Sequence, residues 1–123
     1  MTVKAISLVD KHAQFEEPWE PKRIATVDNY EVKLAKASGS FDWHKHDDED
    51  ELFYVTQGIL HIEMDGQDTV VLGPGELCVI PKGVRHRPVA QTKDVHLMLF
   101  EKAGVTNTGD NTDSDLTQEL VDL

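Results

Sequence analysis

The sequence is poor in cysteine, in basic residues and in long apolar runs, and each shortage excludes a class of protein. Its single cysteine, Cys78, has no partner for an internal disulfide, which suits a reducing compartment. No apolar run approaches the roughly 18 residues of a membrane-spanning helix, and residues 1–10 lack the apolar core of a signal peptide. We therefore expect a soluble, cytoplasmic protein whose 123 residues form one domain with its own core.

Basic residues are outnumbered, with 12 Lys and Arg against 23 Asp and Glu, for a formal net charge of -11. The acids gather at residues 47–51 and after residue 109. Such a charge repels phosphate backbones and anionic lipid, so we expect neither nucleic acid nor a membrane surface as a partner. A small-molecule ligand is the partner that this composition leaves open.

Helical periodicity is also missing before residue 101, where short β-rich segments alternate with turn signals such as Gln57-Gly58 and Asp65-Gly66. This punctuation predicts an all-β fold, closed or sandwiched. Strands are expected at residues 23–27, 30–37, 41–46, 52–56, 59–64, 69–72, 77–80, 85–90 and 95–100.

The chain divides into three expected parts: a lead-in (1–22), a β domain (23–101) and an acidic polar tail (102–123). The lead-in is expected to be irregular, with either coil or a short strand at 5–8. In the tail, Leu116, Leu120 and Leu123 fall at roughly helical spacing, which predicts either one short docking helix or disorder.

Three histidines and one glutamate form the candidate metal site. His44 and His46 are two residues apart, so an extended strand presents both on one face. Glu51 follows a hydrophilic bend and opens an apolar run, which places it to face the interior. Pro81 and Gly83 supply a tight turn before His86. Three imidazoles and one carboxylate can enclose a divalent metal and leave room for an exogenous ligand.

Other ligand-type residues compete less well. Asp50 is one residue out of register with Glu51 and should point to the opposite face. The acidic run 47–50 lacks the spaced oxygens and central glycine of a calcium loop. His61 and His96 alternate with apolar neighbours and should face away from the metal, while His12 is expected to be solvent-exposed. Cys78 is expected to be a buried packing residue.

The spacing as a whole resembles the two signature motifs of the cupin superfamily. The first motif is matched by Gly39, His44, His46, Glu51 and Gly58, and the second by Gly75, Pro81, Gly83 and His86. The resemblance implies a small antiparallel β-barrel, the double-stranded β-helix or jelly roll, with His44, His46, Glu51 and His86 as metal ligands. Ala90 stands where cupins often carry Asn. Trp43-His44 and Asn107-Thr108-Gly109 resemble small single-domain cupins of the mannose-6-phosphate-isomerase-like type.

These features predict a metal-dependent enzyme acting on a small oxygen-rich metabolite, of isomerase, epimerase or dioxygenase type. The donor set favours Fe, Mn, Ni or Zn over magnesium or calcium, and the sequence does not choose among the four. Phe53, Val55, Leu60, Ile62 and Met64 are expected to wall the site. No inward-facing proton-transfer group is evident besides the ligands, so catalytic residues stay unassigned and a non-catalytic binding module is the alternative.

A homodimer is the expected assembly. Residues 52–56, 77–80 and 95–100 are apolar on both faces of their strands, which is more than a half-solvated sheet needs. A second copy of the chain would cover the extra face.

Overall fold

The computed structural model describes residues 2–123, which form one short helix and nine strands. Their bounds are α1 (Leu8–His12), β1 (Lys22–Val27), β2 (Tyr30–Ala37), β3 (Glu51–Gln57), β4 (Leu60–Met64), β5 (Val70–Leu72), β6 (Leu77–Ile80), β7 (His86–Ala90), β8 (Val95–Lys102) and β9 (Val121–Asp122). Among these residues no helix has the length and apolar character needed to cross a membrane.

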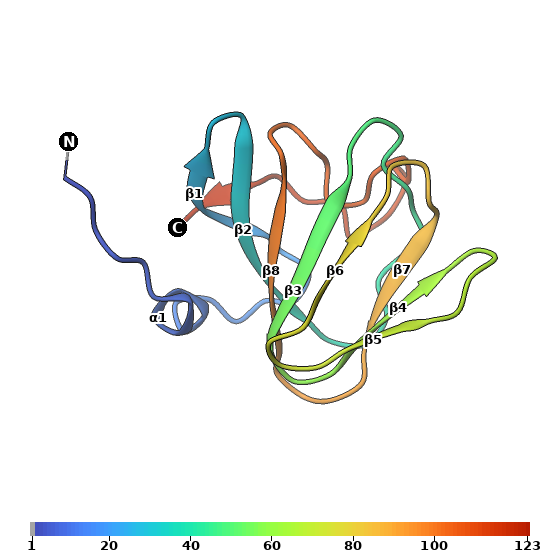
Figure 1. Ribbon diagram of the computed structural model, residues 1–123, viewed down its shortest axis with the longest axis horizontal. Helices are drawn as coiled ribbons and strands as arrows, with labels where there is room; N and C mark the ends of the chain where they lie inside the picture. The colour runs from blue at the N-terminus through green and yellow to red at the C-terminus, as the bar shows by residue number, and fades with distance from the viewer. Residues whose placement is uncertain (1) are drawn as a thin grey trace.

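Two sheets make up the fold (Figure 1). The larger has six strands in the order β6-β3-β8-β2-β1-β9, and the smaller has three in the order β5-β4-β7. All neighbouring strands run antiparallel except β1 and β9, which pair in parallel. The predicted all-β jelly roll is confirmed, although the sheets pack as a sandwich and do not close into a continuous barrel.

The core lies between the two sheets, and strand alternation determines which side chains enter it. In β8, Val95, Leu97 and Leu99 are buried, whereas the intervening Met98 and Phe100 are only half-buried on the outer face. The smaller sheet contributes Leu60, Ile62 and Leu72 from the opposite side. In both sheets every second side chain points inward. The two inner faces therefore pack against each other, and no helix is needed to cover them.

Residues 41–46 differ from the predicted strand, since only isolated bridges at Ser40↔Val89 and His44↔His86 join this segment to β7. Pro88 gives a reason. Its carbonyl accepts a hydrogen bond from the Phe41 N–H at 2.9 Å, but proline has no N–H to return, so the ladder is interrupted. The segment therefore enters the site as an irregular stretch held at two points.

The two ends of the chain also differ from expectation. Residues 5–7 are coil, one of the two alternatives for the lead-in, but the short helix α1 was not expected; it begins after Ser7, whose hydroxyl accepts a hydrogen bond from the Asp10 N–H at 3.1 Å. The tail forms neither a helix nor a free coil. It runs as a series of turns, packs Leu116 against the core and ends in β9.

Candidate metal centre

The four predicted ligands come together at one end of the sandwich, where β3 and β7 begin. Glu51 is the first residue of β3, His86 the first of β7, and His44 and His46 lie on the connection between β2 and β3. One donor atom from each residue lies within 4.8 Å of the other three. All four side chains are buried, none more than 5% exposed. The prediction that these residues share one site therefore agrees with the geometry.

Backbone hydrogen bonds fasten the two ligand-bearing segments to each other. His44 and His86 exchange a pair of N–H···O bonds of 3.0 and 2.8 Å. The turn before His86 contributes a third bond, from the Gly83 N–H to the His46 carbonyl at 2.7 Å. Gly83 adopts φ +81, a left-handed conformation that glycine reaches without strain. The turn predicted from Pro81 and Gly83 thus sets the position of His86.

The rings of His44 and His86 are oriented by their own backbone. Nδ1 of His44 lies 2.9 Å from the Asp42 carbonyl, and Nδ1 of His86 lies 2.9 Å from the Val84 carbonyl. A carbonyl can only accept, so each Nδ1 carries the proton and each Nε2 keeps its lone pair. Metal-binding histidines commonly have this arrangement, which fixes the tautomer before a metal arrives.

The inward-facing donor atoms lack other partners. Oε1 of Glu51 lies 3.4 Å from Nε2 of both His46 and His86, and these three buried atoms make no hydrogen bond. Buried polar atoms are normally satisfied, and a shared cation would satisfy all three. The cluster therefore fits a divalent transition metal.

Electrostatics keep the site ready for a cation. Burial, with a smaller contribution from His86, lowers the pKa of His44 to about 4, so this imidazole is neutral near pH 7. Burial alone would raise the pKa of Glu51, but the neighbouring His46 and His86 outweigh it and hold that pKa well below its usual range. Burial also disfavours a charged His46, yet the Glu51 carboxylate raises the pKa of His46 overall. A proton on His46 therefore competes with a metal.

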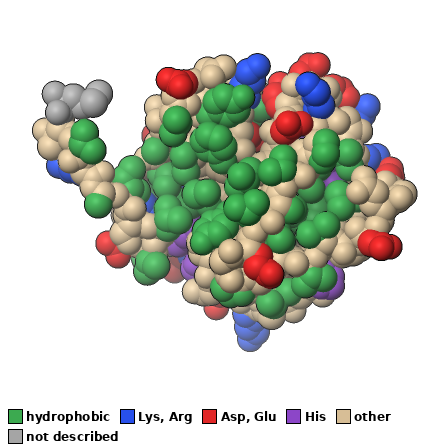
Figure 2. Space-filling view, viewed as in Figure 1, with side chains coloured by type: hydrophobic (Ala, Val, Ile, Leu, Met, Phe, Trp, Pro, Cys, Tyr) green, Lys and Arg blue, Asp and Glu red, His purple; other side chains and the backbone are tan. Residues whose placement is uncertain are grey.

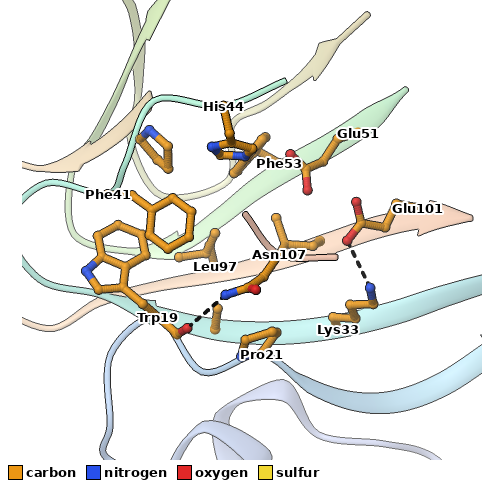
Figure 3. A pocket seen from close by; sticks show the side chains of 13 residues that line it. Trp19, Pro21, Lys33, Phe41, His44, Glu51, Phe53, Leu97, Glu101 and Asn107 are labelled. Atoms are coloured by element: carbon orange, nitrogen blue, oxygen red, sulfur yellow. Dashed lines mark hydrogen bonds and ion pairs between the residues drawn. The ribbon is translucent and has the colours of Figure 1, made fainter. Parts of the chain in front are cut away.

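A buried lysine and glutamate that the sequence analysis missed lie beside this cluster. Nζ of Lys33 is 3.0 Å from Oε1 of Glu101 and 3.6 Å from Oε1 of Glu31, and all three side chains are almost fully buried. Figure 3 shows the Glu101 carboxyl pointing toward Glu51, with Lys33 on its other side. Burial and the Glu51 carboxylate raise the pKa of Glu101 well above its usual range, and Oε2 of Glu101 is buried without a hydrogen-bond partner.

These groups open onto a small cavity of about 40 Å³. Its apolar wall includes three aromatic side chains, Trp19, Phe41 and Phe53, and the rings of Trp19 and Phe41 lie 4.8 Å apart (Figure 3). Of the predicted wall residues, only Phe53 lines the cavity. Val55, Leu60 and Ile62 are buried in the core elsewhere, and Met64 is half-buried.

The C-terminal tail packs directly over the site. The Asn107 amide donates to the Leu116 carbonyl at 2.8 Å, and its side-chain oxygen accepts from the Gln118 N–H at 3.0 Å. Gly109 has φ +55 and lies so close to the backbone of Lys45 that a Cβ there would overlap the Lys45 carbonyl oxygen. The same imaginary Cβ would lie 3.1 Å from the His44 ring. The tail is therefore part of the site's wall.

The competing residues lie elsewhere. Asp50 is exposed and accepts a hydrogen bond from the Lys82 N–H at 2.9 Å, outside the cluster. Cys78 packs against the core, and burial raises the pKa of its thiol to about 11, which makes it unreactive near neutral pH. The expectation for His12 was wrong, because its ring is buried between α1 and the larger sheet. Carbonyl oxygens of Leu8, Ala35 and Leu97 surround it at 3.0 to 3.3 Å, and His96 stacks on it at 4.6 Å.

Comparisons with known proteins agree with this site and fold. The chain belongs to the cupins, since the cupin domain family (Cupin_2) matches residues 30–101. It is 37% identical over 97 residues to the uncharacterized protein YdbB of Bacillus subtilis (strain 168), covering 79% of this chain and 80% of YdbB.

Solved structures show the same fold. A cupin-2 domain containing protein from Shewanella frigidimarina superposes with a TM-score of 0.75 at 41% identity, over 79% of this chain and 93% of that one. The DMSP lyase DddQ from Ruegeria pomeroyi shares the fold at 17% identity, with a TM-score of 0.56, over 66% of this chain and 44% of that one.

Proposed function

We propose that this protein is a small metal-dependent enzyme that transfers a proton on an oxygen-rich metabolite, as isomerases and epimerases do. The observation that carries the proposal is the Lys33–Glu101 pair, 3.0 Å apart, in the cavity that His44 and Glu51 also line. A cation and a carboxyl group beside a metal site are the groups that acid–base chemistry requires. Lys33 and Glu101 would supply the proton-transfer group that the sequence alone did not reveal.

The metal that best suits three imidazoles and one carboxylate is Fe, Mn, Ni or Zn, and when bound it supplies a Lewis acid that polarises a C–O group. His44, His46, Glu51 and His86 would hold it. Glu101 is placed to give or take a proton at its carboxyl, and Lys33 to hold that carboxyl and attract an anionic substrate. Trp19, Phe41 and Phe53 exclude water around the substrate.

Two other functions are alternatives, and the first rests on a specific observation. Lys33 is already paired with Glu101 and Glu31, so the pair would also suit a non-catalytic module in which these charges only support the fold. Dioxygenase chemistry does not depend on such a pair, and for that reason we place it behind proton transfer.

The likeness to mannose-6-phosphate-isomerase-like cupins stays a prediction. A reducing cytoplasm is supported by the single cysteine.

The first experiment measures metal in protein purified without added metal. His46→Ala and His86→Ala should reduce the bound metal to near background, whereas His61→Ala, a matched histidine on β4, should retain it. Circular dichroism checks that each variant is folded. Loss of metal in His61→Ala, or its retention in both ligand variants, would contradict the ligand assignment.

The second experiment screens sugar phosphates, hydroxy acids and catechols with metal-loaded protein in deuterated water. Proton transfer should appear in NMR spectra as deuterium incorporation at one substrate carbon. Glu101→Gln should keep the metal and lower kcat by about 100-fold or more. Oxygen consumption without deuterium exchange would favour a dioxygenase, and turnover that Glu101→Gln leaves unchanged would remove Glu101 from the mechanism.

A further inference from the structure

The segment that carries His44 and His46 is hydrogen-bonded along both of its edges. The backbone groups of His44 and the carbonyl of His46 bond to β7 and to the turn before it. The backbone groups of Trp43 and Lys45 point to the opposite side, as those of alternate residues in a strand do. The segment therefore lies like a central strand, with β7 along one edge and a second neighbour along the other.

The second neighbour is part of the C-terminal tail, residues 107–114, which we call the strap. The Asp110 N–H donates to the Lys45 carbonyl at 3.0 Å, and the Asp110 carboxylate accepts from the Lys45 N–H at 2.9 Å. The Asn111 side chain donates to the Trp43 carbonyl at 3.2 Å. Figure 1 shows the tail looping over the end of the sandwich where β3 and β7 begin, and returning to β9 beside β1. The strap thus takes the place of a neighbouring strand.

The strap also reaches the groups that orient the His44 ring. Gly109 lies against this ring, so closely that a Cβ at residue 109 would be 3.1 Å from it. The Ser114 hydroxyl donates to the Asp42 carboxylate, and the Asp42 carbonyl accepts from Nδ1 of His44. Asp42 therefore connects the strap to the ring whose tautomer its carbonyl fixes.

Polar contacts hold the strap against the ligand segment. Hydrophobic side chains gather over β2, β8 and β3 in Figure 2, whereas in the strap Asp110 is exposed and Asn111 is half-buried. Segments held by exposed hydrogen bonds open locally at a lower cost in free energy than core strands do. The attachments on either side of these residues are firmer, because Thr108 is fully buried and Leu116 packs against the core. The strap can therefore leave the ligand segment while the sandwich stays folded.

We propose that the docked strap holds His44 and His46 in their metal-binding arrangement, and that Asp110, acting through Lys45, is its main positioning residue. When the strap opens, one edge of the ligand segment is free, and fewer molecules present both rings to the shared centre. The apparent dissociation constant for metal rises as that competent fraction falls. Because linkage is reciprocal, a bound metal stabilises the docked strap by the same factor. The inference depends on the metal site but not on the proposed proton transfer.

Titration of the metal-free protein with cobalt(II) chloride tests the strap, because the visible absorption of cobalt reports both affinity and coordination geometry. Asp110→Ala removes the acceptor of the Lys45 N–H, so it should weaken cobalt binding by about tenfold or more and change the spectrum. Asp110→Asn keeps a side-chain oxygen that can accept this N–H, and it should restore both affinity and spectrum. Asp113→Ala is the matched control, since Asp113 is an exposed acid of the same strap that is not among its bonds to residues 42–45.

The outcomes separate the strap from the metal centre. Cobalt affinity that Asp110→Ala leaves unchanged would overturn the strap alone. A loss of affinity that Asp113→Ala shares, or that Asp110→Asn does not restore, would also overturn it, because the effect would then come from charge and not from position. Wild-type protein that binds no cobalt would overturn the metal centre, and with it both the strap and the proposed function.

Hydrogen exchange of the wild-type protein gives an independent answer if Asp110→Ala fails to fold. Saturation with zinc should slow exchange of the Lys45 and Asp110 amides, which the strap and the ligand segment share. The Leu123 amide, which bonds to the Arg23 carbonyl farther along the same tail, is the matched control and should change less. Equal protection of all three amides, or no protection of any, would refute the coupling between strap and metal.

Discussion

Replacing Lys33 by methionine tests the buried ion cluster beside the metal centre. Methionine keeps most of the length of the side chain and removes its charge, so Oε1 of Glu101 loses a hydrogen-bond donor at 3.0 Å and Oε1 of Glu31 loses a cation at 3.6 Å. Breaking a buried ion pair typically costs about 3 to 5 kcal/mol. The raised pKa of Glu101 disfavours its charged form, and Glu31 retains Arg23, so we expect the lower end of this range.

Urea unfolding measures the loss directly. A cost of about 3 kcal/mol, with an m-value of about 1 to 3 kcal/mol per molar urea, lowers the unfolding midpoint by about 1 to 3 M. The double variant Lys33→Met with Glu101→Leu should lose less than the two single variants together, by about 1 kcal/mol or more. Lys102→Met, at an exposed position of β8, should cost less than about 0.5 kcal/mol. Additive losses would show that the two side chains do not interact.

Two further predictions concern pH and backbone. Without metal, the free energy of unfolding should fall as pH drops from 6.5 toward 4, because the unfolded chain binds protons that the folded His44, with a pKa of about 4, does not. The slope is about 1.4 kcal/mol per pH unit for each such proton. The lowered pKa values of His12 and His96 act in the same sense, whereas the raised pKa values of Glu101 and His46 act in the opposite one. A flat profile between pH 6.5 and 5 would contradict this balance. Gly109→Ala should lower Tm more than Gly66→Ala does, since both glycines have positive φ but only Gly109 would overlap a neighbour; equal shifts in calorimetry would show that the tail yields.

The residues of the candidate metal centre were predictable because they share short-range patterns that survive folding. The two-residue spacing of His44 and His46 and the turn before His86 are local, and strand alternation places Glu51 inward. Lys33 and Glu101 were missed, although alternation also contains their signal. Lys33 has the same parity as the inward Ala35, and Glu101 the same parity as Leu97 and Leu99. A charged residue at an inward position of an apolar strand is the sign that would have found them.

His12 was beyond this kind of prediction. The burial of His12 depends on the packing of α1 against the larger sheet. Its partners Ala35 and Leu97 lie 23 and 85 residues away in the sequence. A helix of five residues leaves almost no periodic signal, and only the Ser7 cap indicates it. The tail escaped prediction for the same reason. Its order comes from contacts such as that of Asn107 with Leu116, and leucine spacing alone does not report them.

The candidate metal centre lies at one end of the sandwich, and this leaves the other end free for alteration. The turns around Gly58, Gly73–Glu76 and residues 91–94 lie at the ends of β3, β5 and β7, opposite the ends from which Glu51 and His86 begin their strands. Surface turns tolerate insertions when their backbone is exposed and lightly bonded. Residues 91–94 are exposed. A fluorescent label or a tether placed at Lys93 would therefore report on the molecule, or attach it to a support, with the metal centre untouched.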